Sequence, residues 1–119
     1  YAMNKATNFT SFKAALEQNH LPMFNIMYAD KADNIFYISN GKIPYRNKDT
    51  SYHWSSTLPG NTKATLWNEF KPLNALPQMT NPNSGYLFNA NHSPFLASSE
   101  LDNLNSTNFD KMIFYVVIL

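Results

Sequence analysis

The sequence predicts an α+β fold with a short helix, an antiparallel hairpin and long loops. Apolar side chains over residues 11–18 recur at the spacing of one helix face, which is typical of an amphipathic helix. Two stretches rich in aromatic and aliphatic residues, 23–29 and 35–39, flank a short polar segment, which is typical of a hairpin. Frequent asparagine in the rest of the chain favours turns and loops over long helices.

The helix has recognisable ends in the sequence. Thr10 or Ser11 is expected to be its N-cap, because small hydroxyl side chains accept hydrogen bonds from the free N–H groups of a first turn. Phe12 and Leu16 share the face that is expected to be buried. Pro22 cannot continue a helix, so the helix is expected to end before it.

The hairpin is expected to span residues 23–39. Phe24, Ile26 and Tyr28 give its first strand a mostly apolar character. Residues 30–34 contain two Asp and one Asn, whose side chains bond their own backbone in turns. The two strands are therefore expected to pair in antiparallel fashion.

A further strand is expected after a turn at Asn81 and Pro82. Proline fixes its own φ and disfavours helix for the residue before it. Gly85 adds backbone freedom, and the apolar residues that follow predict a short buried strand over residues 86–89.

The remaining segments give weaker signals. Residues 47–63 are mostly polar apart from Trp54, and Trp67 follows them, which predicts a long loop held against the protein surface by its aromatic and proline residues. Leu101 and Leu104 are expected to be the apolar anchors of the segment after the further strand. Residues 112–119 are wholly apolar, which predicts a buried strand or, if exposed, an aggregation-prone tail.

Composition excludes several classes of protein. Of the 119 residues, 44% are hydrophobic and 15% aromatic, which is enough for a core. The net charge of +1 and the scattered basic residues argue against a nucleic-acid binder. No secretory leader pattern and no apolar stretch of the ~20 residues that a membrane helix needs are visible.

Polar side chains gather at the end of the expected strand 86–89. An amide NH2 group of Asn89 or Asn91, held at a strand end, can donate a hydrogen bond to a developing oxyanion, which is a large contribution to acyl-transfer catalysis. The same amides can instead satisfy backbone groups locally. The residues alone leave both interpretations open, and His92 beside them is expected to be structural.

No metal site or cofactor is expected. The chain has no cysteine, so thiolate sites are excluded. The histidines and nearby aspartates do not show the close spacing of a metal-binding motif. These side chains are His20, His53, His92, Asp30, Asp33 and Asp49.

Two separated blocks of sequence carry a resemblance to a known family. Residues 81–94, NPNSGYLFNANHSP, resemble the Asn-Pro-x-Ser-Gly-Tyr-(aliphatic)-x-Asn-x-Asn-x-Ser-Pro segment of the penicillin acylase (penicillin amidase) family. Residues 28–46 match a second family block, through Tyr-Ala-Asp, Asn-Ile and Tyr and then a glycine, a proline and an arginine. The resemblance extends from the first residues to about Ser99. Residues 112–119 depart from the family, which continues with a polar segment and an Arg-bearing helix.

The resemblance implies an N-terminal-nucleophile hydrolase that cleaves linear amides. It places Asn91 in the oxyanion hole, with Asn89 as a secondary candidate. Family nucleophiles are an N-terminal Ser, Thr or Cys, and Tyr1 cannot serve as one. Residues 1–119 are therefore expected to form one partial domain: an interior fragment of the catalytic (beta) chain, inactive alone and belonging to an αββα sandwich.

The resemblance also implies substrates, partners and a location. The substrate is expected to be a small-molecule amide, either the acyl side chain of a β-lactam or an N-acyl-homoserine lactone. The partners are the alpha chain and the rest of the beta chain, with no nucleic acid and no membrane. The location is expected to be periplasmic or secreted. The alternative is a non-catalytic binding module that uses Trp54, Trp67 and the Asn-rich loops.

Overall fold

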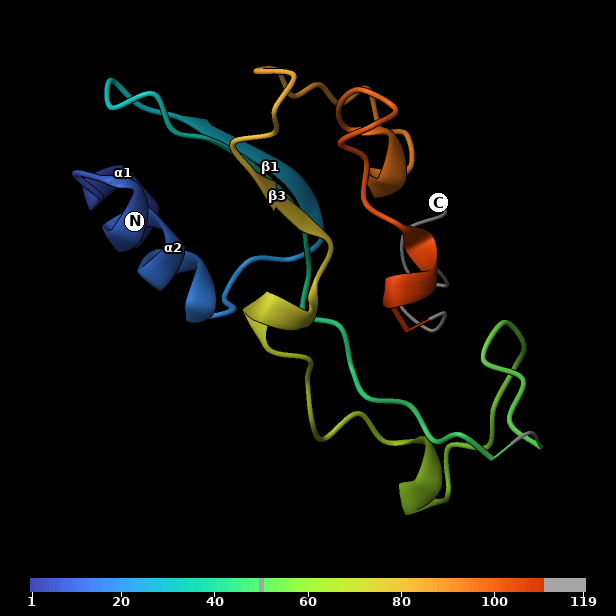
Figure 1. The fold of residues 1–119 in the computed structure, drawn as a ribbon. Coiled ribbons are helices and arrows are strands. Elements are labelled where there is room, and N and C mark those ends of the chain that lie inside the picture. Colours follow the sequence, from blue (N-terminus) through green and yellow to red (C-terminus); the bar gives the residue numbers. More distant parts are fainter. Residues whose placement is uncertain (50, 111–119) are drawn as a thin grey trace.

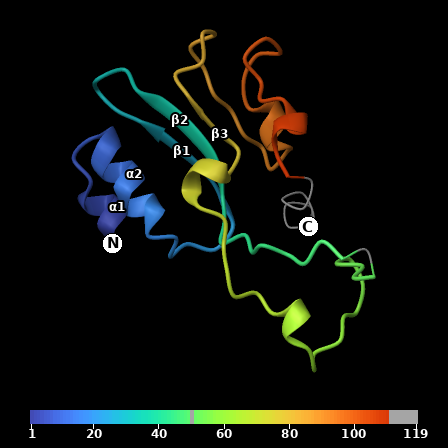
Figure 2. The ribbon, with the colours of Figure 1, turned by 60° about the horizontal axis from the view of Figure 1, so that its bottom comes forward.

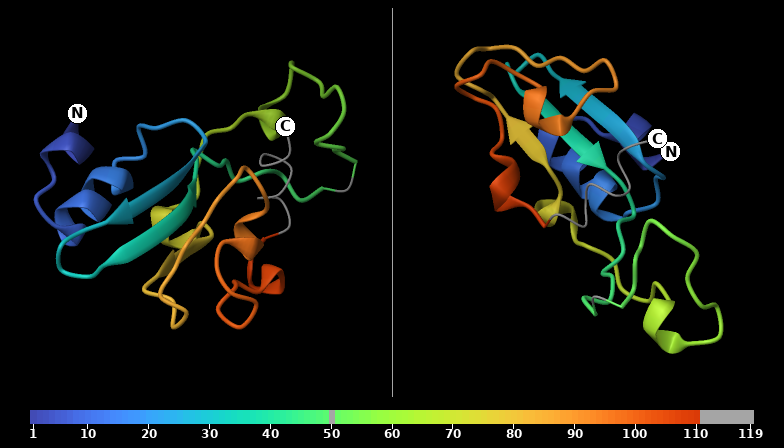
Figure 3. Two further views of the ribbon diagram at one scale, coloured as in Figure 1. Left: turned by 90° about the horizontal axis from the view of Figure 1, so that it is seen from above. Right: turned by 90° about the vertical axis from the view of Figure 1, so that its right-hand side faces the viewer.

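The computed structural model describes residues 1–49 and 51–110. In this part of the chain, two helices and a three-stranded antiparallel sheet are joined by long loops, which confirms the α+β fold class. Figure 1 shows the fold, and the right-hand view of Figure 3 shows the three strands side by side in the order β1-β2-β3. The elements are α1 (Ala2–Lys5), α2 (Phe9–Glu17), β1 (Phe24–Ala29), β2 (Ile35–Asn40) and β3 (Gln78–Thr80), with 3-10 turns at Lys63–Thr65, Leu73–Ala75, Pro94–Leu96 and Ser106–Asn108.

Helix α2 begins two residues earlier than predicted, and its N-cap is Asn8 rather than Thr10 or Ser11. The extended backbone of Asn8, with φ −160°, lets its Oδ1 accept the N–H of Ser11 at 2.9 Å. The Ser11 hydroxyl oxygen accepts the Asn8 N–H in return at 3.2 Å. Ser11 therefore completes a capping box from the third position of the helix. A serine is equally suited to the N-cap position, so its residue type alone did not distinguish the two roles.

The predicted hairpin is confirmed. Strands β1 and β2 pair antiparallel with Ile26 opposite Ile38. Their turn is organised by Asp30, whose Oδ1 accepts the N–H groups of Ala32 at 2.8 Å and Asn34 at 3.1 Å. The Tyr28 hydroxyl donates to Asp30 Oδ2 at 2.8 Å. The carboxylate thus satisfies several donors that the turn would otherwise leave to water.

The hydrogen bonds to the Asp30 carboxylate predict a loss of stability in acid. The Tyr28 hydroxyl and then the Asn34 groups lower the pKa of Asp30 from 3.8 to about 2. Because the folded-state pKa lies below the unfolded value, this stabilisation is complete above about pH 3.8 and is lost as the pH falls through about 2. Melting temperatures measured from pH 5 to pH 2 should therefore fall less steeply for Asp30→Asn. Asp33→Asn, in the same turn, is the matched control, and equal slopes for all proteins would contradict the prediction.

The strand predicted over residues 86–89 is wrong, and the third strand is β3. Tyr86 and Phe88 are each 47% exposed and belong to no strand. In β3, Met79 lies opposite Tyr37 and is buried. Pro77 O extends the ladder by accepting the Ser39 N–H at 2.9 Å. The free backbone groups of β2 decide where the third strand forms. Three residues flanked by polar ones are enough to form a strand beside β2, whereas the apolar run at residues 86–89 has no partner strand.

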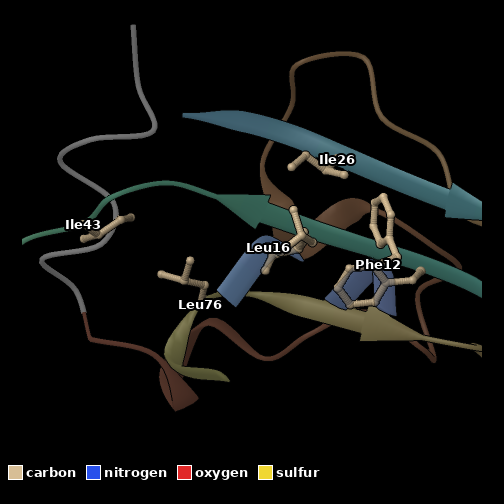
Figure 4. Packing of buried hydrophobic residues seen from close by; sticks show 7 residues of the cluster. Phe12, Leu16, Ile26, Ile43 and Leu76 are labelled. Atoms are coloured by element: carbon tan, nitrogen blue, oxygen red, sulfur yellow. The ribbon is translucent and has the colours of Figure 1, made fainter. Parts of the chain in front are cut away.

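The hydrophobic core lies between α2 and one face of the sheet. Phe12 and Leu16 point from α2 towards Ile26 of β1 and Phe36 of β2, as Figure 4 shows for the labelled side chains. Phe36 is fully buried. The predicted apolar face of the helix is therefore confirmed at both positions.

The opposite face of the sheet is covered by residues 81–110. Figures 1 and 2 show this segment on the side of the sheet away from α1 and α2. Tyr37 of β2 is fully buried on this face although it points away from the core. Of the two leucines expected to anchor the segment, Leu101 is 98% exposed, so the expectation is wrong for that residue, whereas Leu104 is half-buried. Contacts such as the Phe95–Phe109 ring pair, 5.6 Å between centroids, hold the segment.

Residues 47–49 and 51–70 form a projecting arm rather than a loop against the protein surface. Figures 1 and 3 show this segment extending away from the sheet, so the expected placement is wrong. At its base, Lys71 N–H donates to Ile43 O at 2.8 Å and Tyr45 N–H donates to Glu69 O at 2.9 Å. These backbone hydrogen bonds pair the two ends of the arm. The arm is therefore held in place at its base, without contacts between its aromatic residues and the sheet. Residues 112–119, predicted as a strand or tail, lie outside the described residues.

Candidate functional site

The segment that carries the candidate amides leaves the sheet at a fixed point. Asn81 has φ +47°, a left-handed conformation that asparagine tolerates. Its N–H donates to Ile35 O at 2.9 Å, and its Oδ1 accepts the Ile35 N–H at 2.8 Å. Its Nδ2 donates to Asn34 Oδ1 at 3.4 Å. The turn expected at this asparagine is thus bonded to Asn34, the last residue of the hairpin turn, and to Ile35, the first residue of β2.

The next part of the segment is held by Asp102, which the sequence did not single out. Its Oδ2 accepts the Ser84 N–H at 2.8 Å and the Ser99 hydroxyl at 2.9 Å. Its Oδ1 accepts the Asn83 N–H at 3.2 Å. The Ser84 side chain and then the Ser84 N–H, followed by the Ser99 hydroxyl and the Asn83 N–H, lower the pKa of Asp102. A carboxylate distant in sequence therefore closes the loop that contains Asn89 and Asn91.

A buried serine adds a second closure of the same loop. Ser98 is 5% exposed, and its hydroxyl donates to Tyr86 O at 2.9 Å. Its Oγ also lies 2.9 Å from Ser84 Oγ, within hydrogen-bond distance. The Phe88 N–H donates to Ala97 O at 3.0 Å. The apolar run is thus bonded to residues after Pro94 instead of to a neighbouring strand.

Asn91 lies at the exposed tip of this loop. Its φ of +58° is left-handed, and its N–H donates to Asn89 Oδ1 at 3.0 Å. Within the described part of the chain, the Asn91 side chain makes no hydrogen bond. Its backbone is fixed while its amide is turned to solvent, which is the arrangement that a donor to an external carbonyl requires.

Asn89 has the opposite orientation. The residue is only partly exposed, and its Nδ2 is buried without a partner among the described residues. Its Oδ1 is used by the Asn91 N–H. The amide of Asn89 therefore faces the loop interior, and this geometry favours Asn91 over Asn89 as the group that meets a substrate.

His92 bonds the loop on both sides of Asn91. Its Nδ1 lies 3.1 Å from the Ala90 nitrogen, and its Nε2 lies 3.0 Å from Leu96 O. Its ring packs on Phe88 with 4.8 Å between centroids. The structural role expected for this histidine is consistent with these contacts.

The tip of the loop borders a hollow of about 270 Å³. We call this the amide hollow, because three of its lining side chains are asparagine. The Tyr37 hydroxyl donates to Asn25 Oδ1 at 2.8 Å, and Asn40 Nδ2 donates to Pro22 O at 3.3 Å. Burial raises the pKa of Tyr37 to about 12, so its phenol remains a donor. The lining residues are Met23, Phe24, Asn25, Ser39, Asn40, Asn91 and His92.

A second, more apolar hollow of about 350 Å³ lies at the turn end of the hairpin. The Tyr28 hydroxyl in its wall is already bonded to Asp30. This hollow therefore offers an apolar surface, whereas amide donors gather at the first one. Its lining residues are Met27, Tyr28, Ala29, Ile35, Gly85, Tyr86 and Leu87.

The two tryptophans are engaged inside the projecting arm. The guanidinium carbon of Arg46 lies 5.8 Å from the Trp54 ring centroid and 5.7 Å from that of Trp67. The Trp54 indole N–H donates to Asn47 O at 3.0 Å. Both rings therefore pack against one arginine within the arm, although Trp67 is still 53% exposed.

The described residues hold neither a cluster of metal ligands nor a membrane-spanning helix. Across residues 1–49 and 51–110, no three His, Asp or Glu side chains come together as they would around a metal ion. Neither helix in those residues is long and apolar enough to cross a bilayer.

A comparison with known protein families gives a match over nearly the whole chain. A family model described as penicillin amidase matches residues 1–111. The match includes the loop around Asn91 and the whole three-stranded sheet.

Proposed function

The chain belongs to the penicillin amidase family, a family of linear-amide hydrolases, and we propose that it forms part of an enzyme of this kind. The observation that carries the proposal is the geometry of Asn91. Its backbone is fixed in a left-handed turn, while its amide faces solvent at the edge of the amide hollow. A donor fixed in this way is suited to a carbonyl oxygen that gains negative charge during reaction.

The proposed mechanism is nucleophilic. An N-terminal Ser, Thr or Cys, supplied from outside these 119 residues, attacks the amide carbonyl with its own α-amine as base. Asn91 donates its Nδ2–H to the oxyanion of the tetrahedral intermediate. Collapse of the intermediate releases the amine and leaves an acyl-enzyme, which water then hydrolyses to the free acid.

The proposal extends to substrate and location through the family. The amide is the acyl side chain of a β-lactam or of an N-acyl-homoserine lactone, and the enzyme acts in the periplasm or after secretion. The other interpretation of the sequence, a binding module built on Trp54 and Trp67, has less support because both rings already contact Arg46.

The shape of the chain supports its assignment to a larger αββα catalytic domain that includes the alpha chain and the rest of the beta chain. The radius of gyration is 16.0 Å, whereas a compact domain of this length has about 13.5 Å. Residues that are large, apolar and 40% or more exposed occur on both the sheet and the arm, and neighbouring segments would cover them. They include Met23, Phe24, Met27, Leu66 and Trp67.

The test compares the 119-residue chain with the mature product of its full reading frame. Each is assayed with a chromogenic phenylacetyl amide and a long-chain acyl amide. The full product should hydrolyse at least one substrate, and the 119-residue chain should hydrolyse neither because it lacks the nucleophile. Turnover by the short chain alone, or no turnover of either amide by the full product, would count against the proposal.

A further inference from the structure

Two side chains hold the backbone on either side of Asn91. On one side, Asn89 Oδ1 accepts the Asn91 N–H at 3.0 Å. On the other, the His92 ring lies within hydrogen-bond distance of the Ala90 nitrogen and of Leu96 O. The N–H groups of the two consecutive residues Ala90 and Asn91 are therefore both bonded to side chains of the same loop.

The hydrogen-bond partners of the His92 imidazole determine which of its two nitrogens carries a proton. A backbone N–H can only donate, so His92 Nδ1 is the acceptor of the Ala90 bond and carries no proton. A carbonyl oxygen can only accept, so Nε2–H is the donor to Leu96 O. Only the neutral Nε2–H tautomer makes both bonds.

We propose that His92 is a positioning residue that fixes the direction of the Asn91 side-chain amide. This inference rests on the proposed function, in which Asn91 is the oxyanion donor. The backbone conformation of Asn91 restricts which rotamers its short side chain adopts, so holding the backbone limits the directions in which the amide points. By joining Ala90 N–H to Leu96 O, the imidazole ties the residue before Asn91 to the turn that follows it.

The exposure of the surrounding residues indicates that these hydrogen bonds orient the loop more than they stabilise the fold. Ala90 and Asn91 are exposed, and Leu96 is 54% exposed. Water can therefore replace either hydrogen bond if the imidazole is removed, and the fold should survive. The amide of Asn91 would then sample several directions, and a displacement of ~1 Å at a catalytic group can lower a rate by about 10²-fold.

The test uses two variants of the full-length enzyme that separate hydrogen bonding from packing. His92→Phe keeps a ring that can stack on Phe88 but removes both hydrogen bonds. His92→Asn removes the ring but places its Oδ1 where Nδ1 lies, so it keeps the acceptor for the Ala90 N–H. We expect His92→Phe to lower kcat by about tenfold or more with little change in KM, and His92→Asn, which keeps the bond to Ala90 but loses the bond to Leu96, to restore part of that loss. If His92→Asn is as slow as His92→Phe, or if His92→Phe keeps the wild-type kcat, the proposal is overturned.

Hydrogen exchange gives a readout that does not depend on activity. Mass spectrometry of a peptide covering residues 89–92 should show faster amide exchange in His92→Phe than in wild type or His92→Asn. Equal exchange in all three proteins would overturn the positioning role. If exchange behaves as expected while Asn91→Ala keeps the wild-type kcat, the proposed function fails and the positioning of Asn91 stands.

A double variant tests whether the effect passes through Asn91. In an Asn91→Ala background, His92→Phe should cause little further loss of kcat, because the group that it positions is already gone. A full, independent loss in that background would show that His92 acts by another route and would overturn the proposal.

Discussion

Replacement of Asn91 by alanine in the full-length enzyme is expected to lower kcat by about 10²–10³-fold, since this is the usual effect of removing one oxyanion donor. The effect on KM should be much smaller. The neutral carbonyl of the bound substrate gains little from the donor, whereas the charged oxygen of the transition state gains much. Steady-state kinetics with a chromogenic amide measures both constants.

The conformation of Asn91 makes further variants necessary. Its φ of +58° is unfavourable for alanine, by roughly 1–2 kcal/mol. Asn91→Ala will therefore lose stability as well as the amide. Asn91→Gly removes the amide without this strain, and Asn91→Asp keeps the shape but replaces the N–H donor by an acceptor. All three should lose kcat, and only alanine should also melt at a clearly lower temperature.

Asn89 is the internal comparison for this prediction. Its amide faces the loop interior, and its Oδ1 bonds the Asn91 N–H. Asn89→Ala should lower stability by about 1 kcal/mol and lower kcat far less than the Asn91 variants do. If Asn89→Ala abolishes activity without loss of stability while the Asn91 variants remain active, the oxyanion role belongs to Asn89.

Local patterns were sufficient to predict the hairpin and helix α2. In both, side chains a few residues apart decide the outcome: Phe12 and Leu16 share one helix face, and Asp30 closes the turn with its immediate neighbours. Strand β3 escaped prediction because Met79 is its only buried residue and its place is decided by Tyr37, far away in the sequence. Tyr86 and Phe88 misled the prediction because an apolar run does not identify a strand that has no partner.

The candidate site shows the same limit. Asn91 could be selected from its sequence neighbourhood and its family resemblance. The groups that fix its loop could not, because Asp102 and Ser98 act through hydrogen bonds to residues 12 to 19 positions earlier. A serine or aspartate in an Asn-rich segment carries no signal of such a distant partner. His92 was assigned a structural role, and only the distances to Ala90 and Leu96 reveal which groups it holds.

The same leucine-to-alanine substitution should have very different effects at two positions of the chain. Leu16 is 3% exposed in the core between α2 and the sheet, whereas Leu101 is 98% exposed. Leu16→Ala should lower the free energy of unfolding by about 2–5 kcal/mol, because it removes buried apolar surface and leaves a cavity. Leu101→Ala should change it by less than about 0.5 kcal/mol.

Thermal unfolding of the purified 119-residue chain, followed by circular dichroism, measures this difference. A domain of this size loses roughly 4 °C in Tm per kcal/mol, so Leu16→Ala should melt about 8 °C or more below Leu101→Ala. Equal melting temperatures would show that α2 does not pack on the sheet as described. In the full-length enzyme, Leu16→Ala should leave kcat per folded molecule unchanged, because α2 covers the sheet face opposite the amide hollow. Loss of folded protein with intact kcat is the reverse of the result expected for Asn91→Gly, and together the two variants separate the core from the site.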